Sequence, residues 1–187
     1  MPKREKRTFL EFAHELLDED KIDNFLDFVQ FLKDNQLVKE NQISKTKSTS
    51  YSTMIHYTKG ISGKICALNL TDIKSYKPDG GWSIMPNNLF FRDYDKYVAA
   101  EKLKAFILDS TRIKKCRGCE VNRGFGGTIE WVSNNLTVFG EDFSNICNIR
   151  FRNPSGEMLE RAKELILITK NIIVDKLEGE KQCLNKI

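Results

Sequence analysis

The chain has 187 residues, of which 40% are hydrophobic and 30% charged, and its formal net charge is +4. A chain of this size buries enough apolar surface in one core to fold without disulfide or metal support, and the composition excludes a disordered chain. No apolar run approaches the roughly 20 residues that span a bilayer, and a basic start runs into an amphipathic segment, so we expect a cytoplasmic protein with no membrane partner.

The N-terminal segment predicts two short helices. Apolar residues recur from Thr8 at helical spacing, and after a connection at 18–21 a second stripe begins with Asp23 or Asn24 as N-cap and ends at Asn35. The two stripes consist of Phe9, Phe12, Ala13, Leu16 and Leu17, and of Phe25, Phe28, Val29 and Leu32. Residues 1–38 are therefore predicted to form a helical hairpin that packs on the main domain.

Three strands are predicted next. Residues 39–50 are polar and are expected to form an exposed connection. Residues 51–58 are rich in β-branched and aromatic residues, and 63–70 alternate with Cys66, Leu68 and Leu70 on one face, so the two runs predict a hairpin with Cys66 in the core. A turn at 78–81 leads to a third strand at 82–86, which Pro86 ends.

The rest of the chain repeats this plan. Residues 93–109 predict one long helix, and short strands are predicted at 128–133, 136–139 and 148–152. Asn153 followed by Pro154 is typical of an N-cap with proline at the first helical position, and the helix that follows is expected to fray after Lys176.

This order of elements predicts an α+β fold, with an antiparallel sheet of about six strands and helices on one face. The expected domains are the hairpin at 1–38, an α+β domain at 51–177 and a frayed tail at 178–187.

Cys116-Arg-Gly-Cys119 and Cys147 form the pattern most suggestive of chemistry. A Cys-x-x-Cys turn with glycine before the second thiol can present two sulfurs to one zinc ion, and Cys147 is the candidate third ligand. The spacing does not select the fourth ligand among His56, Cys66 and Asp142. A structural zinc site is therefore one interpretation of these three cysteines.

Two other interpretations of these cysteines stay open. Lys114, Lys115 and Arg117 would favour a reactive thiolate, although the residues after Cys119 form a loop-like stretch instead of the helix N-terminus typical of redox pairs. In the other interpretation the cysteines have no chemical role, as is ordinary for scattered thiols in a reducing compartment.

No catalytic motif is present, and the glycine-rich stretch 124–127 lacks the Lys-Ser/Thr of a phosphate-binding loop. Aromatic residues lie on or beside the predicted strands, where they can line a pocket for an apolar ligand or pack in the core. The candidate ligand face consists of Tyr57, Trp82, Phe91 and Trp131.

A resemblance to a set of small bacterial proteins without assigned function extends over residues 63–172. It is carried by Ile65-Cys66-Ala-Leu68, Trp82-Ser-Ile84, Cys116-Arg-Gly-Cys119, Thr137-Val-Phe-Gly140 with Phe143 and Cys147, and Phe151-Arg-Asn-Pro154. In that set a further cysteine follows the CxxC, whereas this chain has Val121 to Gly127 there. The resemblance implies a single folded unit and supplies no substrate or catalytic residue.

The sequence therefore favours a non-enzymatic module that binds a small molecule or a protein. A thiol redox or metal-sensing protein is the first alternative. A nucleic-acid-binding accessory protein is the second, and it depends on the basic N-terminal arm and the lysines of the last helix; the alternation of Lys with Asp and Glu elsewhere disfavours it.

Overall fold

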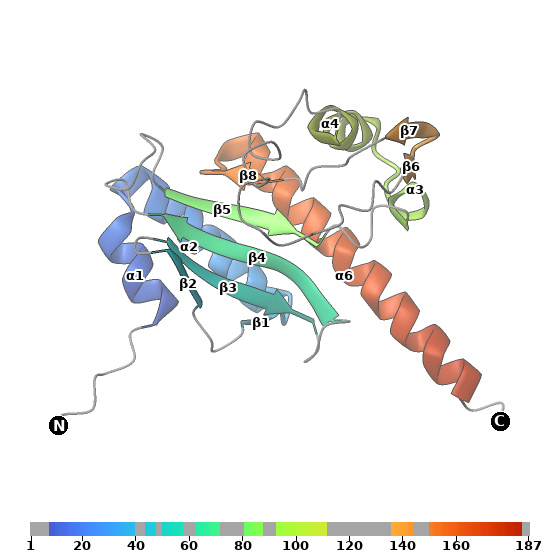
Figure 1. Ribbon diagram of the computed structural model, residues 1–187, viewed down its shortest axis with the longest axis horizontal. Coiled ribbons are helices and arrows are strands. Elements are labelled where there is room, and N and C mark those ends of the chain that lie inside the picture. The colour runs from blue at the N-terminus through green and yellow to red at the C-terminus, as the bar shows by residue number, and fades with distance from the viewer. Residues whose placement is uncertain are drawn as a thin grey trace, which may run out of the picture. The chain divides into compact units, whose positions relative to one another are not determined.

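The computed structural model describes residues 8–39, 44–47, 50–57, 63–71, 81–87, 93–111, 136–143 and 150–184. The chain divides into two compact units, of which unit 1 comprises Met1–Asn87 and Arg150–Ile187 and unit 2 comprises Asn88–Ile149 (Figure 1). The boundaries expected near residues 38 and 51 do not coincide with these units. Within the described ranges, no helix is both long and apolar enough to cross a membrane.

Unit 1 is built around an antiparallel sheet, which confirms the predicted α+β class. The strands pair in the order β1-β3-β4-β5-β8, and β2 also pairs with β3. β8 follows β5 by more than sixty positions in the chain yet lies beside it (Figure 1). The strands are β1 Val38–Lys39, β2 Ser44–Lys47, β3 Ser50–His56, β4 Lys64–Thr71, β5 Gly81–Pro86 and β8 Phe151–Arg152.

The expectation of an exposed connection over 39–50 is wrong for Ser44–Lys47, which forms β2. This segment contains only Ser, Lys and Thr. An edge strand is held by backbone hydrogen bonds and commonly carries lysine, so it needs no apolar pattern that sequence reasoning could detect.

Three helices pack against one face of this sheet: α1 Phe9–Leu16, α2 Glu19–Asp34 and α6 Gly156–Leu184. α1 begins with a capping box in which Thr8 and Glu11 exchange hydrogen bonds. α2 begins at Glu19, with Asp18 as N-cap, and not after Asp23 as predicted. Its acidic first turn complements the positive end of the helix dipole.

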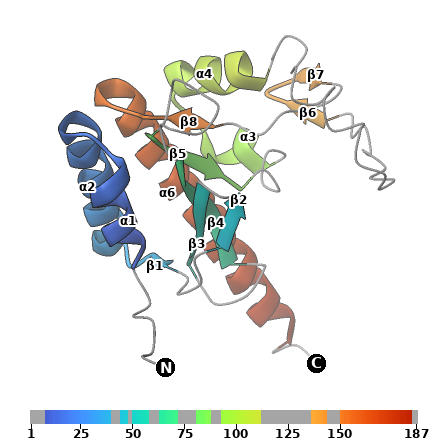
Figure 2. The same cartoon turned by 60° about the vertical axis from the view of Figure 1, so that its left-hand side comes forward.

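The core of unit 1 lies between these helices and the sheet. Phe25 meets Trp82 edge to face at 5.3 Å between ring centroids, and Phe12 stacks on Tyr51 at 4.0 Å. Figure 2 shows α1 and α2 together on this side of the strands. The buried strand residues on this helix face are Thr53, Ile55, Cys66, Leu68, Leu70, Trp82, Ile84, Pro86 and Phe151. The predicted core position of Cys66 is thus confirmed.

The predicted N-cap role of Asn153 is wrong. Asn153 has a left-handed backbone, with φ of 42°, and its side-chain Oδ1 accepts a hydrogen bond from the Trp82 backbone N–H at 2.8 Å. Ser155 accepts the first hydrogen bonds of α6 through its carbonyl. At the other end, α6 stays helical to Leu184, beyond Lys176 where fraying was expected.

Unit 2 contains α3 Tyr94–Tyr97, α4 Glu101–Thr111, β6 Leu136–Val138 and β7 Glu141–Phe143. The single helix predicted over 93–109 is wrong, because the chain is extended at Val98. At about 100° per residue, a continuous helix would point Tyr94 and Val98 away from the side of Leu103 and Ile107. The break allows all four apolar side chains to be buried.

β6 and β7 form a two-stranded sheet of their own, so they do not extend the sheet of unit 1 as predicted. Phe139 and Gly140, which join them, have φ of 50° and 77°, the positive values of a tight hairpin turn. The strand predicted at 128–133 lies outside the described residues.

Candidate functional site

The face of the unit 1 sheet opposite the helices carries polar side chains in register. Side chains alternate along a strand, so the neighbours of the helix-face residues point to this second face. Ser52 pairs with Asn69, Asn69 with Ser83, and Ser83 with Arg152. These four residues, one from each of β3, β4, β5 and β8, form a polar row that runs straight across the sheet.

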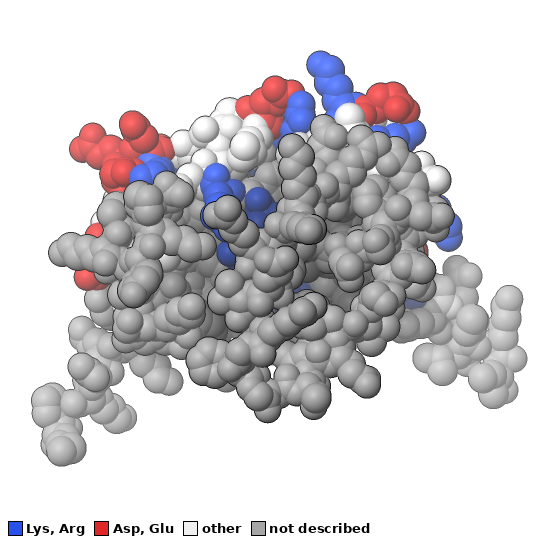
Figure 3. Space-filling view, turned by 45° about the horizontal axis from the view of Figure 1, so that its top comes forward, with Lys and Arg blue, Asp and Glu red and all other residues white. Residues whose placement is uncertain are grey.

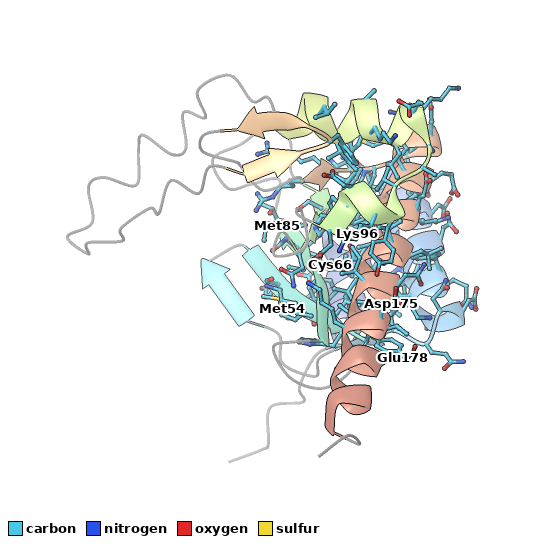
Figure 4. The ribbon with its side chains drawn as sticks, turned by 90° about the vertical axis from the view of Figure 1, so that its right-hand side faces the viewer. Met54, Cys66, Met85, Lys96, Asp175 and Glu178 are labelled. Atoms are coloured by element: carbon cyan, nitrogen blue, oxygen red, sulfur yellow. The ribbon has the colours of Figure 1, made fainter. Side chains whose placement is uncertain are left out.

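A second row follows beside it, formed by Met54, Ala67 and Met85. Arg150 closes this row, because its guanidinium Nη2 lies 3.7 Å from the Met85 Sδ atom. Figure 4 shows Met54 and Met85 toward the side of the sheet away from α2. We call the polar row together with Met85 and Arg150 the arginine face.

Small side chains lie at the centre of this face and long ones at its margin. Ser52 and Ser83 are 6% and 8% exposed, and Ala67 between them is 1% exposed. The Nδ2 atom of Asn69 is buried and has no hydrogen-bond partner in the structure. A buried amide donor without a partner costs about 1–3 kcal/mol, so an acceptor that reached this donor would recover that free energy.

The arginine face is positively charged. Arg150 and Arg152 alternate with the buried Phe151, so both point away from the helices. Partial desolvation of the Arg150 guanidinium and, second, the nearby charge of Arg152 lower the pKa of Arg150. The described strand residues that share this face include no Asp or Glu: they are Ser52, Met54, Ile65, Ala67, Asn69, Thr71, Ser83 and Met85.

Trp82, one of the four aromatic residues predicted to line a ligand face, belongs to the core. It is 3% exposed, and the rings of Phe25 and Phe28 cover it on the helix side. Tyr57 is half-buried, with the Lys170 ammonium 5.5 Å from its ring centroid. Phe91 and Trp131 lie outside the described residues. The structure therefore does not bring these four aromatics together as one described surface.

The predicted zinc ligands Cys116, Cys119 and Cys147 also lie outside the described residues. Of the candidate fourth ligands, Cys66 is fully buried on the helix face, and burial raises the pKa of its thiol. A protonated thiol is a poor metal ligand. Within the described ranges, no three His, Cys, Asp or Glu residues are grouped so that they could hold a metal ion.

A cleft of about 530 Å³ in unit 2 is the second candidate site. It is lined by Asp95, Glu101, Lys104, Ala105, Leu108, Phe139 and Gly140. Asp95 already accepts the Phe139 backbone N–H at 2.6 Å, and Lys104 already pairs with Glu101 at 2.8 Å. Because its charged groups already have partners, this cleft is less prepared for a ligand than the arginine face.

Sequence reasoning missed the arginine face because it followed only the apolar positions of each strand. The same alternation that put Leu68 and Leu70 in the core places Asn69 on the opposite face. Ser83 and Arg152 follow in the same way from Ile84 and Phe151. The signal was therefore present in each strand, but the register that aligns the four residues is not readable from one sequence.

The structure also explains several residues that carried the resemblance to small bacterial proteins. Asn153 exchanges two hydrogen bonds with the backbone of Trp82, and its amide occupies the space where a Cβ of Gly81 would lie. Phe151 pairs with Ile84 in the core. These residues fasten β8 to β5 and so position Arg150 and Arg152. No family model, curated protein or solved structure matches the chain.

Proposed function

We propose that the protein is a non-enzymatic binding module whose arginine face receives a small-molecule ligand. The observation that carries this proposal is the polar row, in which the buried Asn69 Nδ2 atom lacks a hydrogen-bond partner while two serines and an arginine lie beside Asn69 in register. Ligand sites are built in this way, with a few convergent hydrogen-bonding groups on a rigid scaffold.

The scaffold supports binding because the row is held by regular elements. β4 is hydrogen-bonded on both sides, by β3 and β5, and the helix face beneath it is closely packed. Side chains on central strands keep their positions better than side chains on loops. Serine hydroxyls, an amide and guanidinium groups orient a ligand, and none of them titrates near neutral pH.

Thermal-shift screening of the whole chain against a library of small carboxylates, phosphates and neutral polar compounds tests this proposal. We expect at least one compound to raise the melting temperature of the wild-type protein, and the shift to fall in Asn69→Ala. Arg161→Gln is the control, because Arg161 pairs with Glu157 within α6 and lies away from the polar row. Failure of the whole library, or equal shifts in wild type and Asn69→Ala, contradicts the proposal.

The same proposal assigns Cys116, Cys119 and Cys147 to a structural zinc site, with their spacing as its support. Elemental analysis of protein purified without chelator is expected to give about one zinc per chain. Cys116→Ser should lose this metal, while Cys66→Ser should retain it because Cys66 is buried in the core. Metal-free wild-type protein would remove the zinc assignment and leave the proposed ligand site untouched.

Nucleic-acid binding has weaker support. In the coloured part of Figure 3, positive side chains stand beside negative ones, whereas a phosphate backbone is usually met by a stripe of one sign. The described ion pairs fit this mixture, since Lys21, Arg161 and Lys163 each pair with a carboxylate.

A further inference from the structure

We infer that the ligand of the arginine face carries an oxyanion, a carboxylate or phosphate group of a small molecule, which binds between Arg150 and Arg152. This inference depends on the proposed function, because it names the chemical class that the same site would select. Its basis is the placement of two arginines on one face beside a buried amide donor, Asn69 Nδ2, that lacks an acceptor.

The first argument is the pairing of the two arginines. Arg152 lies in β8 and Arg150 just before it, two positions apart and toward the same side of the sheet, so their like charges repel. Among the described residues, the Arg150 guanidinium contacts the Met85 sulfur, a weak acceptor, at 3.7 Å. An oxyanion between the guanidinium groups would reverse this repulsion and supply the strong acceptor that the Met85 sulfur does not.

The second argument is the character of the neighbouring groups. Asn69 Nδ2 can only donate, and it is buried without a partner. Ser83 lies between Asn69 and Arg152 in the register and can donate through its hydroxyl. A guanidinium, a hydroxyl and an amide in one row match the several acceptor lone pairs of a carboxylate or phosphate. They do not match a cationic ligand, for which the face has no described carboxylate.

The third argument concerns size. The centre of the face consists of Ser52, Ala67 and Ser83, three small residues that are each less than a tenth exposed. These residues are covered, so a ligand meets the row at its exposed end, at Arg150 and Arg152. Two neighbouring arginines suit one small anionic group, whereas a polyanion needs basic side chains spaced over many phosphates. Both arginines moreover lie at one end of the row, Arg152 within β8 and Arg150 just before it.

Isothermal titration with three matched probes tests the inference: benzoate, phenyl phosphate and the neutral benzyl alcohol. We expect one of the two anions to bind the wild-type protein and benzyl alcohol not to bind. Arg150→Gln and Arg152→Gln should each weaken the anion by roughly tenfold or more, the range expected for one charge-assisted hydrogen bond. Arg161→Gln should bind as wild type does.

The stability of the ligand-free variants supplies an independent readout. Because Arg150 is repelled by Arg152, ligand-free Arg150→Gln should melt at the wild-type temperature or higher. A clear fall in melting temperature would mean that Arg150 has an anionic partner within the chain, and it would overturn the inference.

The remaining outcomes separate this inference from the proposed function. Binding of a neutral library compound that depends on Asn69 but not on either arginine would keep the binding module and overturn the oxyanion. Binding of single-stranded RNA in preference to both small anions, with a steep dependence on salt, would overturn the small-molecule assignment. The choice between benzoate and phenyl phosphate identifies which oxyanion the site takes.

Discussion

The two faces of the unit 1 sheet are formed by the same strands and differ in what their side chains do. On the helix face, Leu68 and Ile84 pack against α1, α2 and α6 and are at most 1% exposed. On the opposite face, the adjacent residues Asn69 and Ser83 are polar and lie in the row that ends at Arg152. The helix face therefore carries the apolar packing of the sheet, and the opposite face carries a row of hydrogen-bonding side chains that ends at two exposed arginines.

This comparison predicts which substitutions should change stability and which should change binding. Changes on the helix face should lower the free energy of unfolding strongly, since they open cavities in a packed core. Changes at the exposed Arg150 and Arg152 should leave that free energy nearly constant and alter binding.

Phe28→Ala should give the largest effect. The Phe28 side chain is fully buried, with its ring 5.9 Å from Trp82 and 5.7 Å from Phe31. Truncation of a buried phenylalanine costs about 3–5 kcal/mol in free energy of unfolding, which urea denaturation would measure. Leu10→Ala, at a residue 36% exposed on α1, is the control and should cost far less. Equal losses in both variants would contradict the assignment of the core to this face.

Gly81→Ala should give the next effect, because it disrupts the fastening of β8 to β5. The new Cβ would lie 2.0 Å from the Asn153 Oδ1 atom, and Gly81 has φ of 155°. Relieving this clash displaces the Asn153 amide from the Trp82 N–H and should cost about 1–3 kcal/mol. Urea denaturation of this variant measures the loss.

Two further variants test the cause of that loss. Gly81→Ala combined with Asn153→Ala should lose less than the sum of the single variants, because the clash needs both side chains. Gly179→Ala is the control within α6, where a Cβ meets nothing within 4 Å. Alanine there should raise stability by about 0.5–1 kcal/mol, since glycine is a poor helix former. A loss at Gly179 as large as that at Gly81 would rule out the clash as the cause.

Asn69→Leu should change stability by less than about 1 kcal/mol, or raise it, because the variant removes a buried donor that has no partner. Asn87→Leu is the matched control: Asn87 Nδ2 donates to the Lys64 carbonyl at 2.9 Å, and its loss should cost about 1–3 kcal/mol. Calorimetric melting of both variants measures the difference. A larger loss at Asn69 than at Asn87 would mean that the arginine face is part of the core.

Sequence reasoning located the β3, β4 and β5 strands because the apolar residues of one face repeat every second position. It placed Cys66 correctly for the same reason. It failed at Ser44–Lys47, whose pairing depends on backbone groups alone, and at Asn153, whose side chain bonds a strand 71 positions away. It also failed at the break after Tyr97. There the burial of two apolar pairs that a continuous helix would point in opposite directions, Tyr94 with Val98 and Leu103 with Ile107, outweighs helix propensity.

The candidate site was less accessible to prediction than the fold. A polar residue on a strand says nothing by itself, since most polar residues face water. The four members of the polar row acquire meaning only when the register brings them into one line. The aromatic residues first proposed as a ligand face were a weaker guide, because Trp82 serves the core.

The smallest predicted effect concerns two charge pairs, the attractive pair Asp18–Lys21 among the helices and the repulsive pair Arg150–Arg152 on the arginine face. On the helix layer, Lys21 bonds the Asp18 carboxylate at 2.7 Å and, as the largest cause, lowers the pKa of Asp18. Since the folded state favours the ionised carboxylate, this pair stabilises the fold above the unfolded pKa of about 3.9, and the contribution is lost as the pH falls through the lowered folded pKa. Lys21→Gln should return the pKa of Asp18 toward its ordinary value, as measured by NMR titration of the carboxyl carbon.

Added salt should likewise weaken the Asp18–Lys21 attraction, whereas it should relieve the repulsion between Arg150 and Arg152. If salt raised the pKa of Asp18 in Lys21→Gln as much as in the wild type, Lys21 would not be the source of the shift, and the opposed response of the two layers would lose its electrostatic basis.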